Sequence, residues 1–359
     1  MRVSLFDNIK GIAIILVVVG HFCTRVGSVD DSHLIQTAMT FIYLFHMPLF
    51  IFCSGLFAGR SWYKKKGGHK APVDKVLLYL SLYLIFCSLV AVFDLVLLGS
   101  SSTINPFVIG SAPWFMLALA IFFIFIPVMG SIRPVAFMAA SIAIAIAANV
   151  LMSDAKEFTL LRVMVYLPYF ALGFYLQDKG VLSFVEKARN RVRAGALVAG
   201  AWFLLAALFV VLFALPDTFL VALKQLSSGA NLLPAMSDKF GVSVGLLCIA
   251  RFLEYFVVFL VGTIVVLATP TSACFLTFMG ERSFQVYIGH MFVIYTLDAC
   301  SFYAIACASS WWWTLTPFVF GPILTALLAW PKAPNDWVKS LGKLCKNVVS
   351  NEEKRQMIS

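Results

Sequence analysis

Long apolar stretches follow one another along almost the whole chain, and they limit its possible folds more than any other feature. A helix needs about 20 mostly apolar residues to cross the hydrocarbon core of a membrane. Ten segments meet that need approximately, at residues 8–25, 34–57, 76–98, 112–130, 134–152, 160–177, 195–215, 242–268, 284–306 and 311–330. Their apolar residues are continuous and do not alternate with polar ones, which excludes an outer-membrane barrel. The sequence therefore predicts an all-α fold, a polytopic transmembrane helical bundle of about ten spans.

The positions of the charged residues indicate how the chain is oriented. Only 12% of its 359 residues are charged, about half the share found in soluble domains. With an even number of spans, twenty of the 27 lysines and arginines fall on the side that holds both ends, and four fall on the other. This asymmetry predicts cytoplasmic N- and C-termini. It also accounts for the net charge of +10 without a nucleic-acid partner, so we expect membrane lipid and no nucleic acid among the partners.

The connections between the spans carry few features of their own. The longest, at 216–241, is rich in Pro, Ser, Asn and Gly and is expected to be a loop. We expect residues 1–331 to form one transmembrane domain and residues 332–359 a basic cytoplasmic tail. The eight cysteines are scattered, with no Cys/His spacing typical of zinc, so the sequence indicates no metal site.

The first span, in "FDNIKGIAIILVVVGHFC", carries three polar residues on one face. Eleven residues make about three helical turns, so Lys10 and His21 share a face, and Asp7 joins it three residues earlier. Each has a structural explanation: Lys10 could snorkel, Asp7 could cap the helix, and His21 could bind a neighbouring carbonyl. Ionisable groups at membrane depth are also candidates for function. We therefore take His21, Asp7 and Lys10 as candidate catalytic residues.

Further polar and aromatic residues lie at or near membrane depth in later spans. The candidates for binding a donor or substrate are His46, Ser54, Trp114, Arg162, Tyr287 and His290. His46 could instead satisfy the carbonyl that Pro48 frees, and Trp114 could belong to an ordinary aromatic belt. Arg251 and Glu254, three residues apart, are expected to form an internal ion pair. Several convergent histidines are typical of acid–base chemistry or of a proton path.

Five elements in order resemble the membrane acyltransferase-3 family, whose polytopic bacterial members O-acylate sugars of surface polysaccharides. The elements are "FDNIKGIAIILVVVGH", "FHMPLFIFCSGLF", "PWFMLAL", "RVMVYLPYFALGFYL" and "GERSFQVYIGHMFVI". "FHMPLF" with "GHF" is closest to the fucose 4-O-acetylase-like branch. Many members have Arg where Lys10 stands here, and an Arg-x-x-Arg pair that some members carry after the second span has no clean match. Because Lys lacks the bidentate fork of Arg, the donor contacts in this region must differ.

The resemblance implies an integral-membrane O-acyltransferase in the bacterial inner membrane. It implies an acyl-CoA donor, usually acetyl-CoA, that enters from the cytoplasm, and a glycan or lipid-linked sugar as acceptor. His21 would act as general base or carry the acyl group transiently, and Lys10 or Arg162 would position anionic or carbonyl groups. The basic cytoplasmic stretches at 64–66 and 189–193 suit the phosphates of coenzyme A.

Other functions fit the same residues. A proton-coupled secondary transporter or flippase of glycans would use the histidines and Asp7 to relay protons. Transfer to an amino-sugar nitrogen would need the same donor and similar groups. The acceptor sugar and the oligomeric state stay open at this point.

Overall fold

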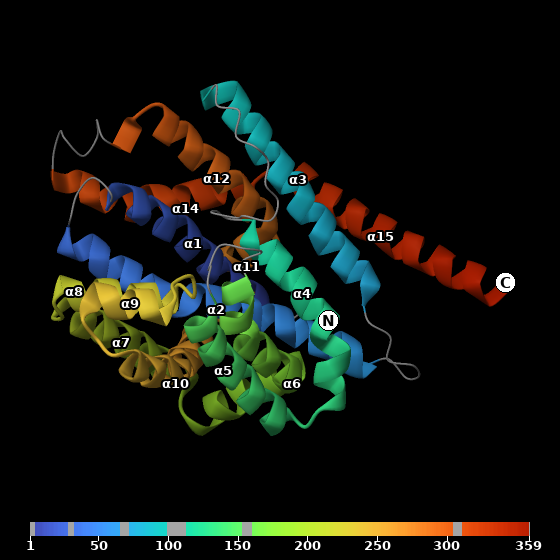
Figure 1. Ribbon diagram of the computed structural model, residues 1–359, viewed down its shortest axis with the longest axis horizontal. Coiled ribbons are helices and arrows are strands. Elements are labelled where there is room, and N and C mark those ends of the chain that lie inside the picture. Colours follow the sequence, from blue (N-terminus) through green and yellow to red (C-terminus); the bar gives the residue numbers. More distant parts are fainter. Residues whose placement is uncertain are drawn as a thin grey trace.

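The computed structural model describes residues 4–27, 32–64, 72–98, 113–152, 160–303 and 311–358. Every regular element in these ranges is helical (Figure 1). In chain order they are α1 (Ser4–Val26), α2 (His33–Lys64), α3 (Val73–Leu98), α4 (Trp114–Ser131), α5 (Pro134–Leu151), α6 (Leu160–Arg191), α7 (Ala194–Phe213), α8 (Asp217–Ser227), α9 (Leu233–Phe240), α10 (Val244–Ala268), α11 (Phe275–Glu281), α12 (Ser283–Ala299), η1 (Trp311–Leu315), α14 (Thr316–Ala329) and α15 (Ala333–Ile358).

Eight of the described helices are long and apolar enough to cross a membrane, namely α1 to α7 and α10. A bent pair, Trp313–Ala329 with Ala333–Asn351, makes a ninth if it is taken as one span. The chain is therefore an all-helical, polytopic membrane protein. The predicted span at 284–306 corresponds to α12, which has 17 described residues.

Two predicted connections are helical rather than loops. The segment at 216–241 holds α8 and α9, so the loop prediction was wrong there. Pro216 precedes the first turn of α8 and Gly241 ends α9 with a positive φ of 67°, so turn-forming residues sit at the ends of these short helices. Helix α6 likewise continues beyond the predicted end of its span to Arg191, across a kink at Gln177.

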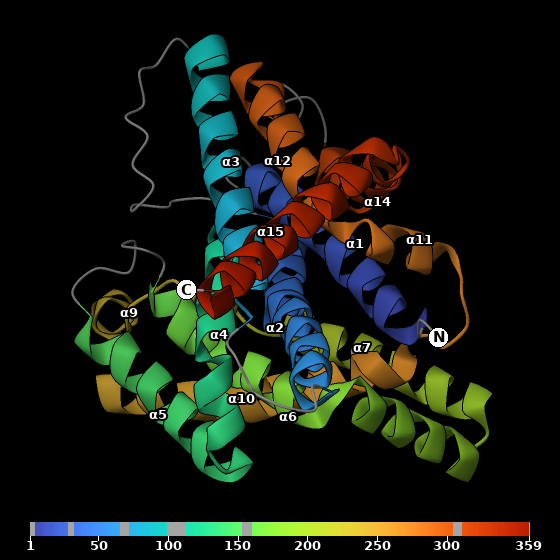
Figure 2. The same ribbon diagram turned by 90° about the vertical axis from the view of Figure 1, so that its right-hand side faces the viewer.

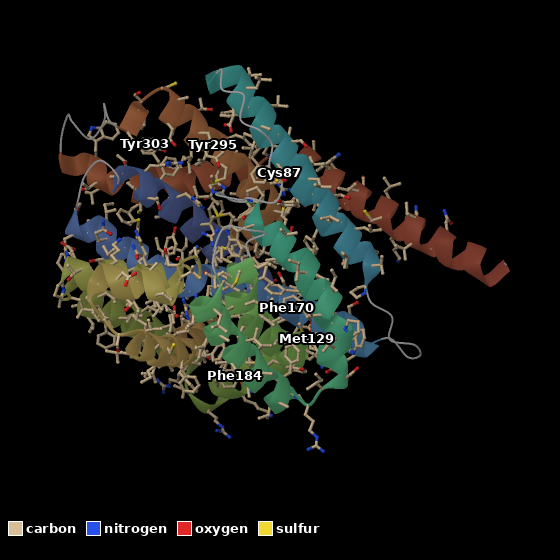
Figure 3. The ribbon with its side chains drawn as sticks, viewed as in Figure 1. Cys87, Met129, Phe170, Phe184, Tyr295 and Tyr303 are labelled. Carbon is tan, nitrogen blue, oxygen red and sulfur yellow. The ribbon has the colours of Figure 1, made fainter. Side chains whose placement is uncertain are left out.

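Helix α2 lies at the centre of the bundle and packs along α6, α1 and α8 (Figures 1 and 2). Its crossing with α6 depends on glycine. A Cβ added to Gly55 would lie 2.1 Å from the carbonyl oxygen of Phe170, and one added to Gly59 would lie 2.0 Å from that of Phe174. Small residues let membrane helices approach closely. The two backbones are consequently in direct contact, and the interior aromatic residues, such as Phe170 in Figure 3, pack around them.

The first and last helices occupy different positions. Helix α1 is enclosed by α2, α11, α12 and α14, whereas α15 packs along α3 and then extends past the other helices towards the C-terminus (Figures 1 and 2). Both helices nevertheless contribute to one cavity, through Lys10 of α1 and Lys346 of α15.

Candidate active site

The start of α1 carries a buried carboxylate paired with a lysine. Lys10 Nζ lies 2.8 Å from Asp7 Oδ1, and the Asp7 side chain is only 3% exposed. The same ammonium lies 5.7 Å from the centroid of the Phe57 ring on α2. A buried carboxylate without a counter-ion costs several kcal/mol, so Lys10 stabilises Asp7 in addition to any contact that it makes with a ligand.

Asn8, which the sequence analysis did not single out, holds this end of α1 in place. Its amide donates to the carbonyl oxygens of Pro270 and Ser272, both at 2.8 Å. Close by, α11 touches α1 directly, because a Cβ added to Gly280 would lie 1.7 Å from the carbonyl oxygen of Asp7. The carboxylate of Asp7 is therefore carried by a rigid part of the backbone.

Two of the predicted histidines meet deeper in the bundle. The rings of His21 on α1 and His290 on α12 have centroids 5.2 Å apart, with their planes inclined by 55°. His290 is fully buried, and its Nδ1 lies 2.9 Å from the carbonyl oxygen of Val286. A carbonyl only accepts, so Nδ1 carries the proton and Nε2 of the neutral ring keeps its lone pair. Among the described residues this buried Nε2 has no hydrogen-bond partner.

His46 has a similar local bond on α2. Its Nδ1 lies 2.7 Å from the carbonyl oxygen of Ile42, so the neutral ring again keeps its lone pair at Nε2. The carbonyl that Pro48 frees belongs to Leu44, four residues earlier. The ring therefore binds a different carbonyl from the one that the structural explanation required. The ring centroid of His46 lies 5.2 Å from that of Tyr43.

Trp114 stands at the start of α4 in a stack of planar groups. Its ring is stacked on Tyr166 with centroids 5.4 Å apart, and the Arg162 guanidinium lies 5.0 Å from the indole. The Tyr166 hydroxyl donates to the carbonyl oxygen of Ser227 at 3.0 Å. Trp114 is buried, which does not fit a place in a lipid-facing belt. The Trp114 ring also lies 6.2 Å from that of Phe115, which in turn lies 5.5 Å from that of Tyr287, so Phe115 links this stack to Tyr287.

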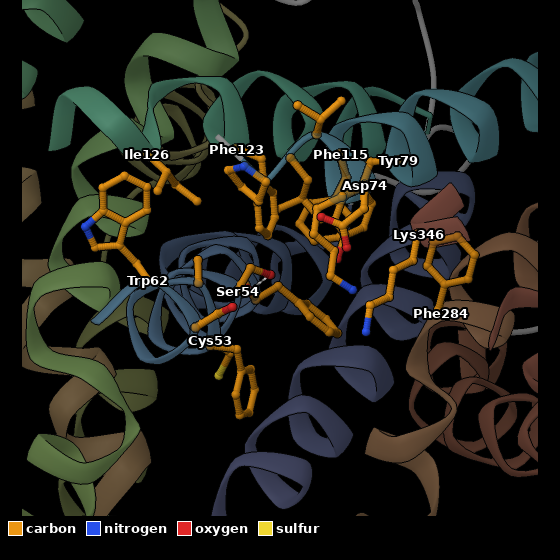
Figure 4. Close-up of a pocket in the computed structure, with 18 of the residues that line it drawn as sticks. Cys53, Ser54, Trp62, Asp74, Tyr79, Phe115, Phe123, Ile126, Phe284 and Lys346 are labelled. Carbon is orange, nitrogen blue, oxygen red and sulfur yellow. Dashed lines mark hydrogen bonds between the residues drawn. The ribbon is translucent and has the colours of Figure 1, made fainter. Parts of the chain in front are cut away.

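A cavity of about 970 Å³ opens beside these groups, between α2, α3, α4, α12 and α15 (Figure 4). Lys75 of α3 and Lys346 of α15 line it, and so does Lys10. Ser54, whose hydroxyl donates to the carbonyl oxygen of Phe50 at 3.0 Å, faces the cavity from α2. Asp74 adds one carboxylate beside Lys75, and most of the remaining lining is aromatic or aliphatic. The cavity thus combines basic side chains with a mainly apolar wall.

Tyr287 connects this cavity to the histidine pair. It lines the cavity, and its ring centroid lies 6.1 Å from that of His290. Neither histidine of the pair lines the cavity, nor does His46, Trp114 or Arg162. The structure therefore brings Lys10, Ser54 and Tyr287 together around one space, and it places His290 next to Tyr287 and His21 next to His290.

A family model described as an acyltransferase domain, that of acyltransferase-3, matches residues 4–331. The chain belongs to the acyltransferase-3 family. No curated protein matches it, and no solved structure does. The match ends before α15, so Lys346 reaches the cavity of this acyltransferase from outside the matched region.

The other charged residues of this acyltransferase fall into two groups. Arg251 and Glu254 form the predicted internal ion pair, and both are buried. Arg189 donates to Thr269 and Thr271, and it does not line the cavity. The position of Arg189 therefore does not support the predicted contact between the stretch at 189–193 and the donor. Lys65 and Lys66 lie outside the described residues.

A Gly-x-Ser-x-Gly pattern at 241–245, which the sequence analysis overlooked, has a structural role. Ser243 is the N-cap of α10, and its hydroxyl accepts from the backbone N–H of Leu246 at 3.3 Å. A nucleophile elbow needs a strand before the serine, whereas here the short helix α9 precedes it. Within the described ranges, no group of three or more His, Cys, Asp or Glu residues could hold a metal ion.

Proposed function

We propose that this acyltransferase moves an acyl group, by default acetyl, from acyl-CoA to a hydroxyl group of a surface or lipid-linked glycan. The observation that carries the proposal is the cavity with lysines and a mainly apolar wall, which ends at Tyr287 beside the His21–His290 pair. An elongated, polyanionic donor with a neutral arm suits such a space. The acyl-CoA would be a substrate that enters and leaves in each turnover.

The donor's phosphates would lie near Lys75 and Lys346, where the cavity presents its basic side chains. The pantetheine arm would run along the wall formed by residues such as Phe50 and Phe115. Its thioester would then reach Tyr287. Ser54 and Lys10 lie along this path and would position the arm and its carbonyl groups.

In the reaction, the acceptor oxygen forms a bond to the thioester carbonyl carbon, and the carbon–sulfur bond breaks. The hydroxyl proton passes to an imidazole, for which His21 is our first choice, and it returns to the departing thiolate to give the coenzyme A thiol. The lone pair on His290 Nε2 would accept a hydrogen bond from the N–H of His21 or from the acceptor hydroxyl. Arg162 would stabilise negative charge on the thioester oxygen, and His46, whose Nε2 keeps its lone pair, would orient the acceptor by accepting a hydrogen bond from it.

The arrangement in the membrane forms part of the proposal. We propose ten spans with both ends in the cytoplasm of a bacterium, so that the basic end of the cavity faces the cytoplasmic pool of acyl-CoA. The histidine pair would then stand in the outer half of the bilayer. An acceptor on the outer side could approach it past Trp114 and Arg162.

The test is to incubate purified protein with acetyl-CoA labelled in its acetyl group and with candidate glycans. We expect label on the glycan with the wild-type protein and a loss of at least about 10² in rate with His21→Ala. Membrane insertion should not change, because one histidine does not decide the folding of many spans. Solute flux into sealed vesicles without acyl transfer would instead support the transporter or flippase, and label on an amino-sugar nitrogen would support N-transfer.

A further inference from the structure

A second, narrower space lies on the opposite side of α2 from the donor cavity. It has a volume of about 300 Å³ and is enclosed by α2, α6 and α10. Phe45, Pro48 and Phe52 line it from α2, on a face turned away from Met47, Phe50 and Ser54, which line the donor cavity. No residue lines both spaces. This groove is therefore a separate feature of the fold.

The groove is apolar along its length. Of its lining side chains only Tyr169 and Thr263 carry a hydroxyl, and that of Thr263 donates to the carbonyl oxygen of Phe259 at 2.8 Å. The groove is open at Gly262, because a Cβ added there would meet only a methyl group of Leu49, at 3.9 Å. All three helices that form it are candidate membrane spans. The surrounding medium is therefore hydrocarbon, and a hydrocarbon chain is the ligand that such walls can hold.

The stretch of α6 at one end of the groove is basic, whereas no charged residue lines the groove itself. Past the kink at Gln177, α6 contributes Gly180 and Phe184 to the lining, and Phe184, which Figure 3 labels, is exposed. In the same stretch Lys179 and Lys187 are exposed, and they outnumber the exposed Glu186. This stretch thus complements an anionic headgroup, and the apolar groove complements a chain.

We propose that this groove binds an anionic phospholipid, with one acyl chain against Gly262 and the headgroup phosphate near Lys179 and Lys187. The lipid would pack against the face of α2 that is opposite the donor cavity. Its binding does not depend on acyl transfer, so the two proposals can fail separately.

Native mass spectrometry of the purified full-length protein in detergent tests this, with phosphatidylglycerol and phosphatidylcholine as probes. We expect the wild type to retain phosphatidylglycerol preferentially. Gly262→Phe, which fills the groove, should weaken that binding by at least about tenfold. The matched control is Gly245→Phe on the same helix, where an added Cβ meets nothing within 4 Å, and it should bind lipid as the wild type does. Lys179→Gln with Lys187→Gln should remove the preference for phosphatidylglycerol.

A second measurement uses the wild-type protein alone, in case Gly262→Phe does not fold. Phosphatidylglycerol with a photoreactive diazirine in its acyl chain should cross-link to residues of α2, α6 and α10 that line the groove. Cross-links spread evenly over lipid-facing helices would overturn the proposal, as would equal retention of the two phospholipids. Displacement of phosphatidylglycerol by a polyprenyl phosphate at equal concentration would also overturn it, by making the acceptor's carrier lipid the occupant.

Discussion

The imidazole rings of His21 and His290 come from opposite ends of the chain and lie with their centroids 5.2 Å apart. The bond from Nδ1 of His290 to the carbonyl oxygen of Val286 fixes which nitrogen carries the proton. His21 has no such bond among the described residues. The pair therefore combines one ring of fixed tautomer with one whose tautomer no hydrogen bond fixes among the described residues, and the proposed reaction uses both.

Replacing His290 tests this division of roles. We expect His290→Ala to lower kcat by about 10², within the range for loss of a group that assists proton transfer, and to leave KM for acetyl-CoA nearly unchanged. His33→Ala is the control, because His33 is partly exposed and pairs with Asp217 away from the cavity. Rates should be measured with labelled acetyl-CoA. Equal losses of kcat in the two variants would show that His290 does not assist proton transfer.

The side chain at position 10 should affect donor binding more than the chemical step. Lys10 lines the cavity and pairs with Asp7, so Lys10→Gln should raise KM for acetyl-CoA by about tenfold, the loss of one charged contact. It should also lower the melting temperature, because it removes the ammonium that pairs with the buried Asp7 carboxylate. Lys10→Arg keeps the charge and should retain most activity. Lys339→Gln on the exposed face of α15, which removes a Lys–Asp pair of the same spacing, serves as control. An inactive Lys10→Arg would show that geometry at this position decides activity.

The helices and the internal ion pair were predictable because both depend on local pattern. Continuous apolar runs indicate spans, and Arg251 lies three residues from Glu254 on one helix. The meeting of His21 with His290 was not predictable, since it depends on how α1 packs against α12. The same holds for Lys346, which the sequence places only in a basic tail and the structure places at the donor cavity.

Two local signals in the sequence indicate helix ends and close helix packing. Gly55 and Gly59 form a Gly-x-x-x-Gly pattern, which is typical of close helix crossings in membranes. The composition of the segment at 216–241 predicts a loop, although Pro216 and Gly241 mark the ends of helices there. In both cases the meaning of a residue depends on its position within the element, which composition alone does not convey.

The crossing of α2 and α6 should be sensitive to a single methyl group. A Cβ at position 55 would lie 2.1 Å from the carbonyl oxygen of Phe170, so Gly55→Ala must push the two backbones apart. We expect a loss of stability of about 1–3 kcal/mol, as for overpacked cores. Gly180→Ala on α6 is the control, because nothing lies within 4 Å of its added Cβ. Thermal unfolding in detergent measures both, and an unchanged melting temperature for Gly55→Ala would refute the contact.

The stability of the protein should change differently when one residue of the buried ion pair on α10 is replaced and when both are replaced. Arg251 also donates to the carbonyl oxygen of Leu226 at 2.6 Å, which ties α10 to the end of α8. Arg251→Met leaves Glu254 buried without its counter-ion and should cost about 3–5 kcal/mol. The double variant Arg251→Met with Glu254→Leu removes both charges and should recover most of that loss. Equal melting temperatures for the single and double variants would mean that the pair contributes through Leu226 alone.

Blocking the donor cavity should stop acyl transfer without unfolding the protein. Ser54 faces the cavity, and its hydroxyl donates to the carbonyl four residues earlier, at Phe50. Ser88 on α3 makes the same kind of bond, to Leu84, but is exposed. Ser54→Phe should therefore weaken acetyl-CoA binding by more than about tenfold, whereas Ser88→Phe should bind as the wild type does. Isothermal titration with coenzyme A compares the two, and equal affinity would place the donor outside this cavity.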